Sequence, residues 1–211
     1  MRYLFLIPLL LVSQISLAGT KVTSQFGFTA VLPDDWFLIN SKKLSVANKN
    51  ETIESLGLQG SVDKEVLNGI LNKVKSGNIE FYYDKKYFNK DFKNNISAQL
   101  SAPLLFNSMD DVKQACKDMP GELKKVFGGP VNLHSCKYLK VNGWPVFHHA
   151  YTVPSQNVTI INENVYVNKK YSIIFVGGSG NGIEGLHRAR AAQQALIESI
   201  VKFFKSQNSG K

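Results

Sequence analysis

Three of the four histidines carry side chains that could bind a metal ion or transfer a proton. His148 and His149 are adjacent in a segment that alternates like a β-strand, and successive side chains of a strand point to opposite faces of a sheet. The two imidazoles therefore cannot bind one metal ion unless the strand bulges. His134 falls on the neighbouring predicted strand, where a cross-strand contact with one of them could form. No acidic residue stands at a useful spacing, so the sequence predicts no metal site.

A glycine-rich segment before the last predicted helix has the spacing of a ligand-binding loop. Gly180, Gly182 and Gly185 match the G-x-G-x-x-G pattern of dinucleotide-binding proteins. However, no βαβ unit follows, and Leu186-His187 stand where a phosphate-binding loop needs Lys and Ser or Thr. We interpret the segment as a strand-to-helix connection whose glycines allow positive φ angles, and we predict no cofactor.

The same segment comes close to a hydrolase motif. Gly177-x-Ser179-x-Asn181 has Asn where a nucleophile elbow has its second Gly, and His187 is the only histidine that follows. The sequence therefore predicts no catalytic residue, and a hydrolase ranks third among the functional hypotheses.

Six aromatic residues and four lysines fall within the 13 residues from 81 to 93. If exposed, they would suit a protein partner or an anionic lipid surface. The candidate partner surface consists of Tyr87, Phe88, Phe92, Lys85, Lys86 and Lys90. The alternative, which we favour, is a hairpin whose aromatic side chains enter the core while its lysines protect the sheet edge.

Two cysteines, Cys116 and Cys136, are present in the chain. In an exported protein such a pair usually forms a disulfide, and without neighbouring histidines or further cysteines it makes a poor zinc site. Cys116 falls on a predicted helix and Cys136 on the strand that follows it. We therefore predict a disulfide that joins helix to sheet.

The first 18 residues have the pattern of a cleaved signal peptide. Arg2 precedes an apolar run from Leu4 to Val12, and small residues stand at Ser16 and Ala18. The run is shorter than the roughly 20 apolar residues that span a membrane, so we predict export to the periplasm or the exterior rather than an integral membrane protein. Loss of Arg2 would leave 24 of the 25 basic residues against 16 acidic ones, a net charge of +8. Such a charge favours acidic partners or anionic surfaces. An exported protein rarely meets nucleic acid, so we predict no nucleic-acid partner.

Hydrophobic periodicity predicts one domain over residues 19–205 and a frayed tail over 206–211. Ser61 is the predicted N-cap of a first helix, Ser108 caps a second that Pro120-Gly121 ends, and a third covers residues 183–204. Asn142-Gly143 predicts a tight hairpin. Predicted strands cover residues 26–32, 36–39, 78–83, 96–100, 131–141, 144–153, 157–167 and 171–176. The fold class is therefore α+β, with a mostly antiparallel sheet and helices on its faces.

The order of these elements is similar to that of a known family. The first strand ends in Leu32-Pro33-x-x-Trp36, an Asn95-Ile96-x-Ala98 strand follows, and Val141 to Val146 leads toward Tyr151 before the final helix. This pattern resembles the PsbP-like superfamily of photosystem II extrinsic proteins, Ran-binding relatives and bacterial exported proteins. The resemblance implies an α/β/α sandwich that binds or assembles rather than catalyses, and it implies no catalytic residues.

The leading hypothesis is accordingly a non-enzymatic exported protein that acts as a binding or assembly accessory by contacting another protein. The alternative is a module that binds a small ligand or lipid in a pocket between sheet and helix.

Overall fold

The computed structural model describes residues 19–46, 64–87, 90, 93–103 and 106–208. The predicted signal peptide, the predicted N-cap Ser61 and the candidate surface residues Phe88 and Phe92 lie outside these residues.

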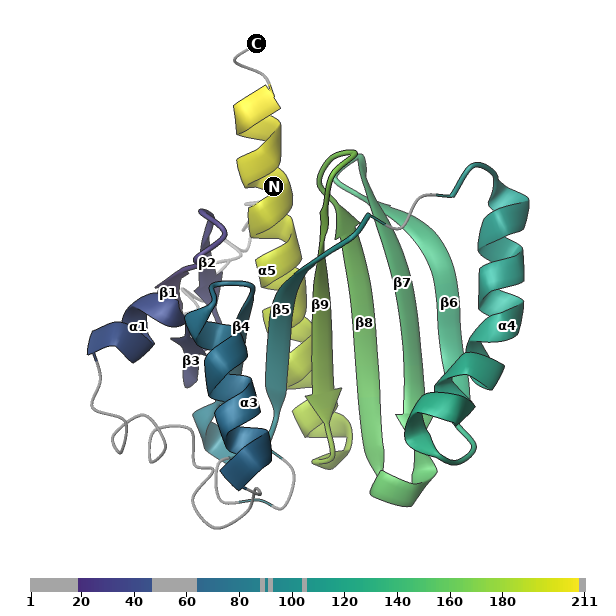
Figure 1. Ribbon diagram of the computed structural model, residues 1–211, viewed down its shortest axis with the longest axis horizontal. Helices are drawn as coiled ribbons and strands as arrows, with labels where there is room; N and C mark the ends of the chain where they lie inside the picture. Colours follow the sequence, from purple (N-terminus) through teal and green to yellow (C-terminus); the bar gives the residue numbers. More distant parts are fainter. Residues whose placement is uncertain (1–18, 47–63, 88–89, 91–92, 104–105, 209–211) are drawn as a thin grey trace, which may run out of the picture.

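A seven-stranded antiparallel sheet forms the centre of the molecule (Figure 1). Each strand pairs antiparallel with its neighbours, in the order β3-β4-β5-β9-β8-β7-β6. The bounds are Trp36–Ile39 for β3, Ile79–Asp84 for β4, Asn95–Ser101 for β5, Asn132–Val141 for β6, Trp144–Val153 for β7, Val158–Tyr166 for β8 and Ser172–Ser179 for β9.

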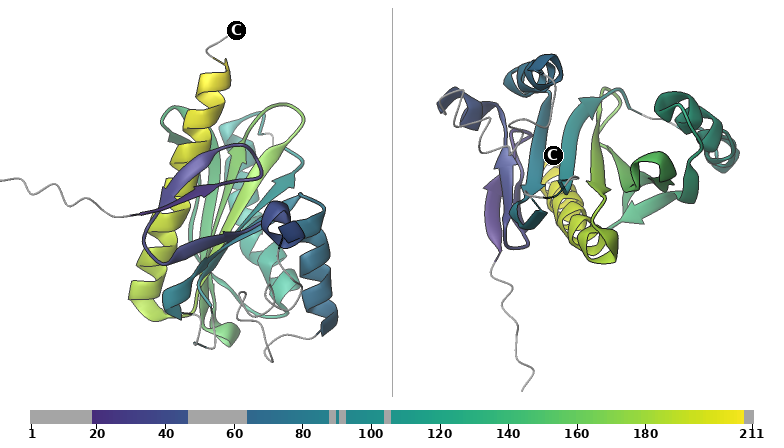
Figure 2. Two further views of the ribbon diagram at one scale, coloured as in Figure 1. Left: turned by 90° about the vertical axis from the view of Figure 1, so that its left-hand side faces the viewer. Right: turned by 90° about the horizontal axis from the view of Figure 1, so that it is seen from below.

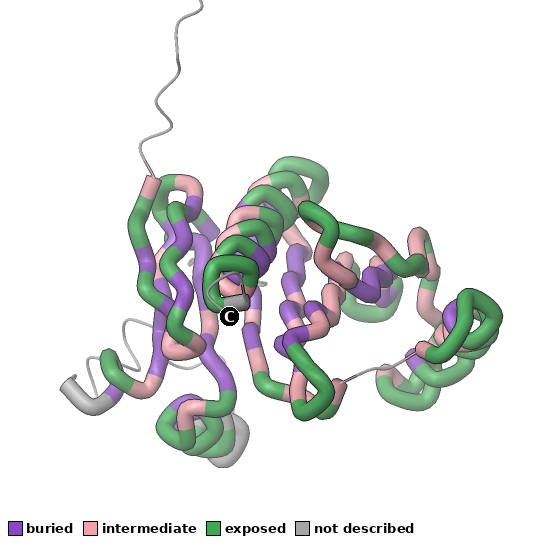
Figure 3. Tube along the Cα trace, turned by 90° about the horizontal axis from the view of Figure 1, so that it is seen from above, coloured by how far each residue is buried: buried purple, intermediate pink, exposed green. Residues whose placement is uncertain are grey.

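Helices cover both faces of the sheet (Figure 2). The long C-terminal helix α5 lies on one face, and α3 and α4 lie on the other, which confirms the predicted α/β/α arrangement and the α+β class. Figure 3 shows the buried positions on the strands and on the side of α5 that faces them. The helix bounds are Ser41–Val46 for α1, Lys64–Lys75 for α3, Met109–Phe127 for α4 and Gly182–Asn208 for α5, with 3₁₀ turns η1 at Lys85–Tyr87 and η2 at Pro154–Gln156. Helix α5 thus takes in residues 206–208 of the predicted tail.

Separate apolar clusters fill the two faces. The largest lies under α5, where Ala192, Leu196 and Ile200 are buried against strand residues such as Phe175 and Ile96. On the other face, one cluster packs β3 and β4 against α1 and α3, and another packs Tyr151 and Val153 against α4. The stretch of sheet between α3 and α4 belongs to neither of these two clusters.

A small hairpin of β1 (Thr20–Thr23) and β2 (Thr29–Leu32) packs beside α5. The prediction of one strand over residues 26–32 is therefore wrong in its first half. Residues 24–28 turn the chain instead, with the Ser24 N–H donating to the Phe28 carbonyl at 2.9 Å. The short polar strand β1 had no apolar run by which it could have been predicted.

A buried carboxylate holds this turn against the main sheet. Glu80 of β4 is fully buried and accepts hydrogen bonds from the Ser24 hydroxyl at 2.6 Å, the Gln25 backbone N–H at 2.9 Å and the Tyr82 hydroxyl. Burial raises the pKa of Glu80, and these three hydrogen bonds act against that rise because they favour the ionised form.

Helix α4 begins as predicted and ends later than predicted. Ser108 accepts a hydrogen bond from the Asp111 N–H at 3.1 Å, and the Asp111 carboxylate accepts one from the Ser108 N–H at 3.0 Å, which is the predicted capping box. Pro120 lies inside the helix, so the prediction that it ends there is wrong. Leu123 and Phe127 of the continued helix pack on Tyr151 and Val153, and this burial offsets the hydrogen bond that proline cannot donate.

The predicted hairpin between β6 and β7 is confirmed. Asn142 and Gly143 have φ angles of 50° and 81°, the left-handed conformation that a two-residue turn of this type requires. Among the residues that the structure describes, no helix combines the length and the apolar character needed to cross a membrane.

Candidate functional site

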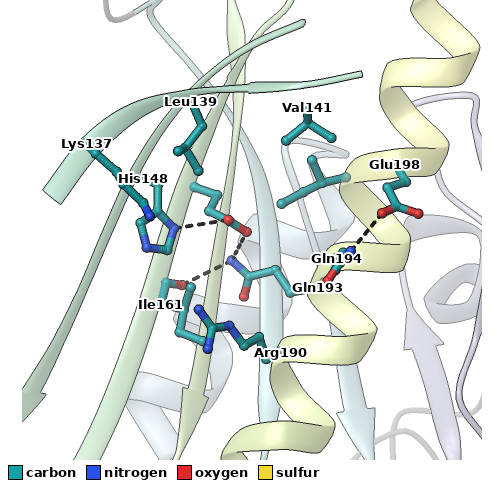
Figure 4. Close-up of a pocket in the computed structure, with 11 residues that line it drawn as sticks. Lys137, Leu139, Val141, His148, Ile161, Arg190, Gln193, Gln194 and Glu198 are labelled. Atoms are coloured by element: carbon teal, nitrogen blue, oxygen red, sulfur yellow. Dashed lines mark hydrogen bonds and ion pairs between the residues drawn. The ribbon is translucent and has the colours of Figure 1, made fainter. Parts of the chain in front are cut away.

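A row of polar side chains crosses the sheet directly beneath α5. Lys137 of β6 is paired with His148 of β7, and His148 is paired with Glu163 of β8. Residues paired in register point to the same face, and this is the face that α5 covers (Figure 4). The sequence pattern put His148 on one face of the sheet but gave no partner for it.

His148 and Glu163 form a hydrogen-bonded pair in the interior. The Nδ1 of His148 lies 3.1 Å from Oε1 of Glu163, and their side chains are only 6% and 16% exposed. The contact is a hydrogen bond between the ring nitrogen and the carboxylate. The carboxylate therefore orients the imidazole and leaves its Nε2 as the second polar atom of the ring.

Gln193 of α5 completes this cluster from the opposite side (Figure 4). Its Nε2 donates to Oε2 of Glu163 at 3.0 Å and to the Ile161 carbonyl at 3.2 Å. Its Oε1 is buried and accepts no hydrogen bond from the residues that the structure describes. The amide holds α5 against β8, and His148, Glu163 and Gln193 form one connected triad, in which His148 and Gln193 are buried and Glu163 is half-buried.

A pocket of about 220 Å³ opens beside this triad, between the sheet and α5. Leu139, Ile161 and Ile197 supply apolar walls. Lys137 and Arg190 lie at the exposed rim, and neither forms an ion pair with any described residue. At the opposite rim, Gln194 donates to Glu198 at 2.8 Å. The pocket thus combines an apolar wall with two cations that form no ion pair with a described residue. It also contains two carboxylates, Glu163 and Glu198, which are hydrogen-bonded to other residues of the lining.

None of the residues that line this pocket is Ser, Thr or Cys, so it offers no nucleophile of these types for covalent catalysis. Among the described residues, no group of three or more His, Cys, Asp or Glu side chains could hold a metal ion. What the lining residues can do directly is bind: they offer two cations, two carboxylates, one imidazole nitrogen and apolar surface.

The other two histidines of the predicted group lie elsewhere. His149 points to the opposite face of the sheet, as the alternation of a strand predicts, and burial together with the charge of His148 lowers its pKa to about 4. His134 falls at a β-bulge in β6 and its Nε2 lies 2.7 Å from the Thr152 hydroxyl. The predicted contact between His134 and one of the adjacent histidines is therefore replaced by a contact with Thr152.

The described residues of the candidate partner surface differ in exposure. Tyr87 is buried at 6% exposure, and Tyr82 and Tyr83 are buried as well, as the core alternative requires. The proposed role of Tyr87 as an exposed contact is thus inconsistent with its position. Lys85, Lys86 and Lys90 are exposed.

Ion pairs tie this lysine-bearing turn to the start of α5. Arg188 donates to the fully buried Asp84 through Nε at 2.7 Å and Nη2 at 2.9 Å, and it also donates to the Asp34 carbonyl at 3.0 Å. Lys86 forms an exposed pair with Glu184. Asp84 thus serves as an anchor for α5 and not as part of the pocket.

The glycine-rich segment connects β9 to α5, as we interpreted it. Gly182 has a φ of 64°, and Gly185 lies so close to Asn94 that its carbonyl accepts from the Asn94 amide at 3.0 Å. A β-carbon on Gly185 would come within 2.7 Å of the Ser179 hydroxyl oxygen. The glycines therefore have a packing role in this connection.

The predicted disulfide between Cys116 and Cys136 is confirmed, with the two Cα atoms 5.5 Å apart. It joins α4 to β6, the edge strand of the sheet, and so fixes a helix to the sheet as predicted.

Sequence reasoning missed Glu163, Gln193 and Arg190. A signal was present for the first two: Glu163 interrupts the apolar alternation of Ile161 and Val165, and Gln193 interrupts the apolar stripe of α5. A polar residue at such a position has to find a buried partner, because an unpaired polar group is costly in the core.

Comparison with solved structures gives similarities of fold. The chain is similar to cyanobacterial PsbP (CyanoP) from Synechocystis sp. PCC 6803, with 12% identity over 91% of this chain and 97% of that one, at a TM-score of 0.47. It is also similar to a protein of Bacteroides thetaiotaomicron VPI-5482, with 11% identity, 85% of this chain covered and a TM-score of 0.39, and it spans about half (47%) of that longer chain. No family model and no curated protein matches the chain. The resemblance to PsbP-like proteins that the order of elements indicated is thus found again, as a likeness of fold alone.

Proposed function

We propose that this protein is a non-enzymatic binding protein, acting after export, that holds a small carboxylate in the pocket between the sheet and α5. The observation that carries the proposal is that Lys137 and Arg190, which form no ion pair with a described residue, lie in one pocket with the His148–Glu163–Gln193 triad and an apolar wall. The two carboxylates of the lining are already engaged, Glu163 with His148 and Gln193 and Glu198 with Gln194. Arginine and lysine without a carboxylate of their own are suited to an anion supplied by a ligand.

The size of the pocket limits the ligand. A volume of about 220 Å³ corresponds to roughly seven water molecules at about 30 Å³ each. That suits a carboxylate with a short branched or ring-shaped apolar part, whose carboxylate would face Arg190 and Lys137 and whose apolar part would lie on Leu139 and Ile197. The imidazole of His148, held by Glu163, offers a further polar contact.

Calorimetric titration of the purified protein with isobutyrate, benzoate and inorganic phosphate tests the proposal. We expect saturable binding of a carboxylate probe and a loss of at least about tenfold in affinity in Arg190→Gln and in Lys137→Gln, because each removes one charge from the rim. Lys202→Gln and Lys140→Gln are matched controls, since they remove a charge from α5 and from β6 outside the pocket. Equal losses in the controls would mean that the effect comes from net charge and not from the pocket.

Contact with another protein is a second proposed function, and it rests on a different surface. Met109 and Val126 on α4 are 57% and 74% exposed, although both are large apolar side chains. They stand near the two ends of the helix, and each would give a partner protein a separate apolar contact. Capture from an envelope extract with wild-type protein and with Val126→Lys, followed by identification of what is retained, tests this. A stoichiometric protein retained by the wild type alone would support it.

A further inference from the structure

A second cavity, of about 360 Å³, lies on the face of the sheet that points away from α5. It occupies the stretch between α3 and α4 that neither apolar cluster of this face covers. Phe147 and His149 of β7, Asn162 and Asn164 of β8, Ile174 of β9 and Met119 of α4 line it, together with the chain that leaves β5.

The register of the sheet arranges these residues in two adjacent rows. His149 is paired with Asn162, and Phe147 is paired with Asn164. Each row therefore sets a flat ring beside a side-chain amide. The rings of Phe147 and His149 have their centroids 5.7 Å apart and are tilted by 48° to each other, so the two rows are adjacent and each offers a ring beside an amide.

The lining of this cavity carries no formal charge. None of its lining residues is Asp, Glu, Lys or Arg, and His149 is neutral near pH 7 because burial lowers its pKa to about 4. This separates it from the pocket under α5, whose rim bears Lys137 and Arg190. A charged ligand would be buried here without an opposite charge, which is costly. An uncharged ligand avoids this cost.

Several polar groups of the cavity have no protein partner. The Nδ1 of His149 is buried and forms no hydrogen bond with any described residue, and the residue as a whole is 9% exposed. The amides of Asn162 and Asn164 are half-buried and form no side-chain hydrogen bond with the residues that the structure describes. A buried polar group is nearly always satisfied, so the Nδ1 of His149 indicates a ligand that supplies a hydrogen-bond partner, and the two open amides could bond to the same ligand.

The disulfide holds one wall of the cavity in place. Cys136 is paired in register with His149, and Cys116 stands one helical turn before Met119 on α4. The bond between the two cysteines therefore fixes the Met119 side of α4 above the row that contains His149. The cavity is bounded by a covalently fixed helix rather than by a free surface.

We propose that this cavity binds a small uncharged heteroaromatic compound, whose flat ring lies against Phe147 and His149 and whose amide or ring nitrogens bond to Asn162 and Asn164. Asparagine offers one acceptor and a two-hydrogen donor, which matches the donor and acceptor pairs at the edge of a heteroaromatic amide. Flat rings stack on aromatic side chains, and the thioether of Met119 suits the same surface.

Nicotinamide and nicotinate form a matched pair of probes, because they share one ring and differ in carrying an amide or a carboxylate. We expect nicotinamide to bind wild-type protein saturably, with amide NMR shifts that change at Phe147, His149, Asn162 and Asn164. We expect nicotinate to bind at this site at least about tenfold more weakly. Adenine and uracil serve as further uncharged probes of the same class.

Asn162→Leu should weaken nicotinamide binding about tenfold or more, since it removes the paired donor and acceptor at nearly constant volume. Asn162→Ser is the second variant should the first fold poorly, and Arg190→Gln is the control, because it lies on the other face. The proposal is overturned if none of the three uncharged probes binds, if nicotinate binds here as well as nicotinamide, or if the Asn162 variants bind like the wild type. None of these outcomes bears on the carboxylate pocket, which the Arg190 variant tests separately.

Discussion

The side-chain amide of Gln193 lies so close above Gly177 that a β-carbon on Gly177 would come within 2.1 Å of its oxygen. Gly177 of β9 thus leaves the space in which Gln193 reaches across to Glu163. The conformation of the triad depends on a residue that is not one of its members.

Gly177→Ala should therefore destabilise the protein by about 2 kcal/mol, because Gln193 must move and give up buried hydrogen bonds. Urea unfolding measures the change. The double variant Gly177→Ala/Gln193→Ala should lose less than the sum of the two single variants, since the clash is absent. Gly121→Ala is the control: a β-carbon there meets no atom within 4 Å, and alanine favours a helix. Equal effects at the two glycines would contradict the role assigned to Gly177.

The side chains of His148 and His149 point to opposite faces of the sheet. We expect His149 to make the free energy of unfolding depend on pH. Its pKa of about 4 in the folded protein lies below its ordinary value of 6.5, so the folded state binds fewer protons than the unfolded state between these values. Stability is then complete above about pH 6.5 and falls as the pH drops toward 4, by about 3 kcal/mol in all. His149→Phe should flatten this slope in unfolding measured from pH 7 to pH 4. His134→Gln, at an exposed position, should leave the slope unchanged; a slope that survives in His149→Phe would show that another group causes it.

Two neighbouring ion pairs at the start of α5 should differ greatly in their effect on stability. Arg188→Gln leaves the fully buried carboxylate of Asp84 without its cation, which costs roughly 3 kcal/mol in comparable buried pairs. Lys86→Gln removes one partner of an exposed pair with Glu184, which water and salt already screen, so we expect a far smaller change. Thermal unfolding of the two variants at low and high salt measures both effects. A larger loss in Lys86→Gln than in Arg188→Gln would refute the assignment of Asp84 as the anchor of α5.

The sequence allowed the local elements to be predicted, because their causes are local. Asn142-Gly143 determines its own turn, the capping box at Ser108 determines where α4 begins, and strand alternation separates His148 from His149. The prediction that the helix ends at Pro120 was wrong because the local effect of proline is outweighed by the packing of Leu123 and its neighbours on the sheet.

The pocket could not be predicted in the same way. Glu163 and Gln193 are 30 residues apart, and their contact depends on how α5 is placed along the sheet. That placement results from the whole apolar stripe of α5 and from the Asp84–Arg188 anchor at its start. A single polar residue in a strand or helix shows that it needs a partner, but the sequence does not say which residue provides it.

The disulfide between Cys116 and Cys136 should stabilise the protein mainly by restricting the unfolded chain. The two cysteines are 20 residues apart, and closure of such a loop corresponds to about 3 kcal/mol. Cys116→Ser/Cys136→Ser should lower the free energy of unfolding by about that amount in urea. Hydrogen exchange should rise most in the first half of α4, because Leu123 and Phe127 still pack the second half on Tyr151. Reductant should lower the stability of the wild type to that of the double variant and leave the variant unchanged. A wild-type protein with two free thiols and unaltered stability would show that packing alone holds α4 against the sheet.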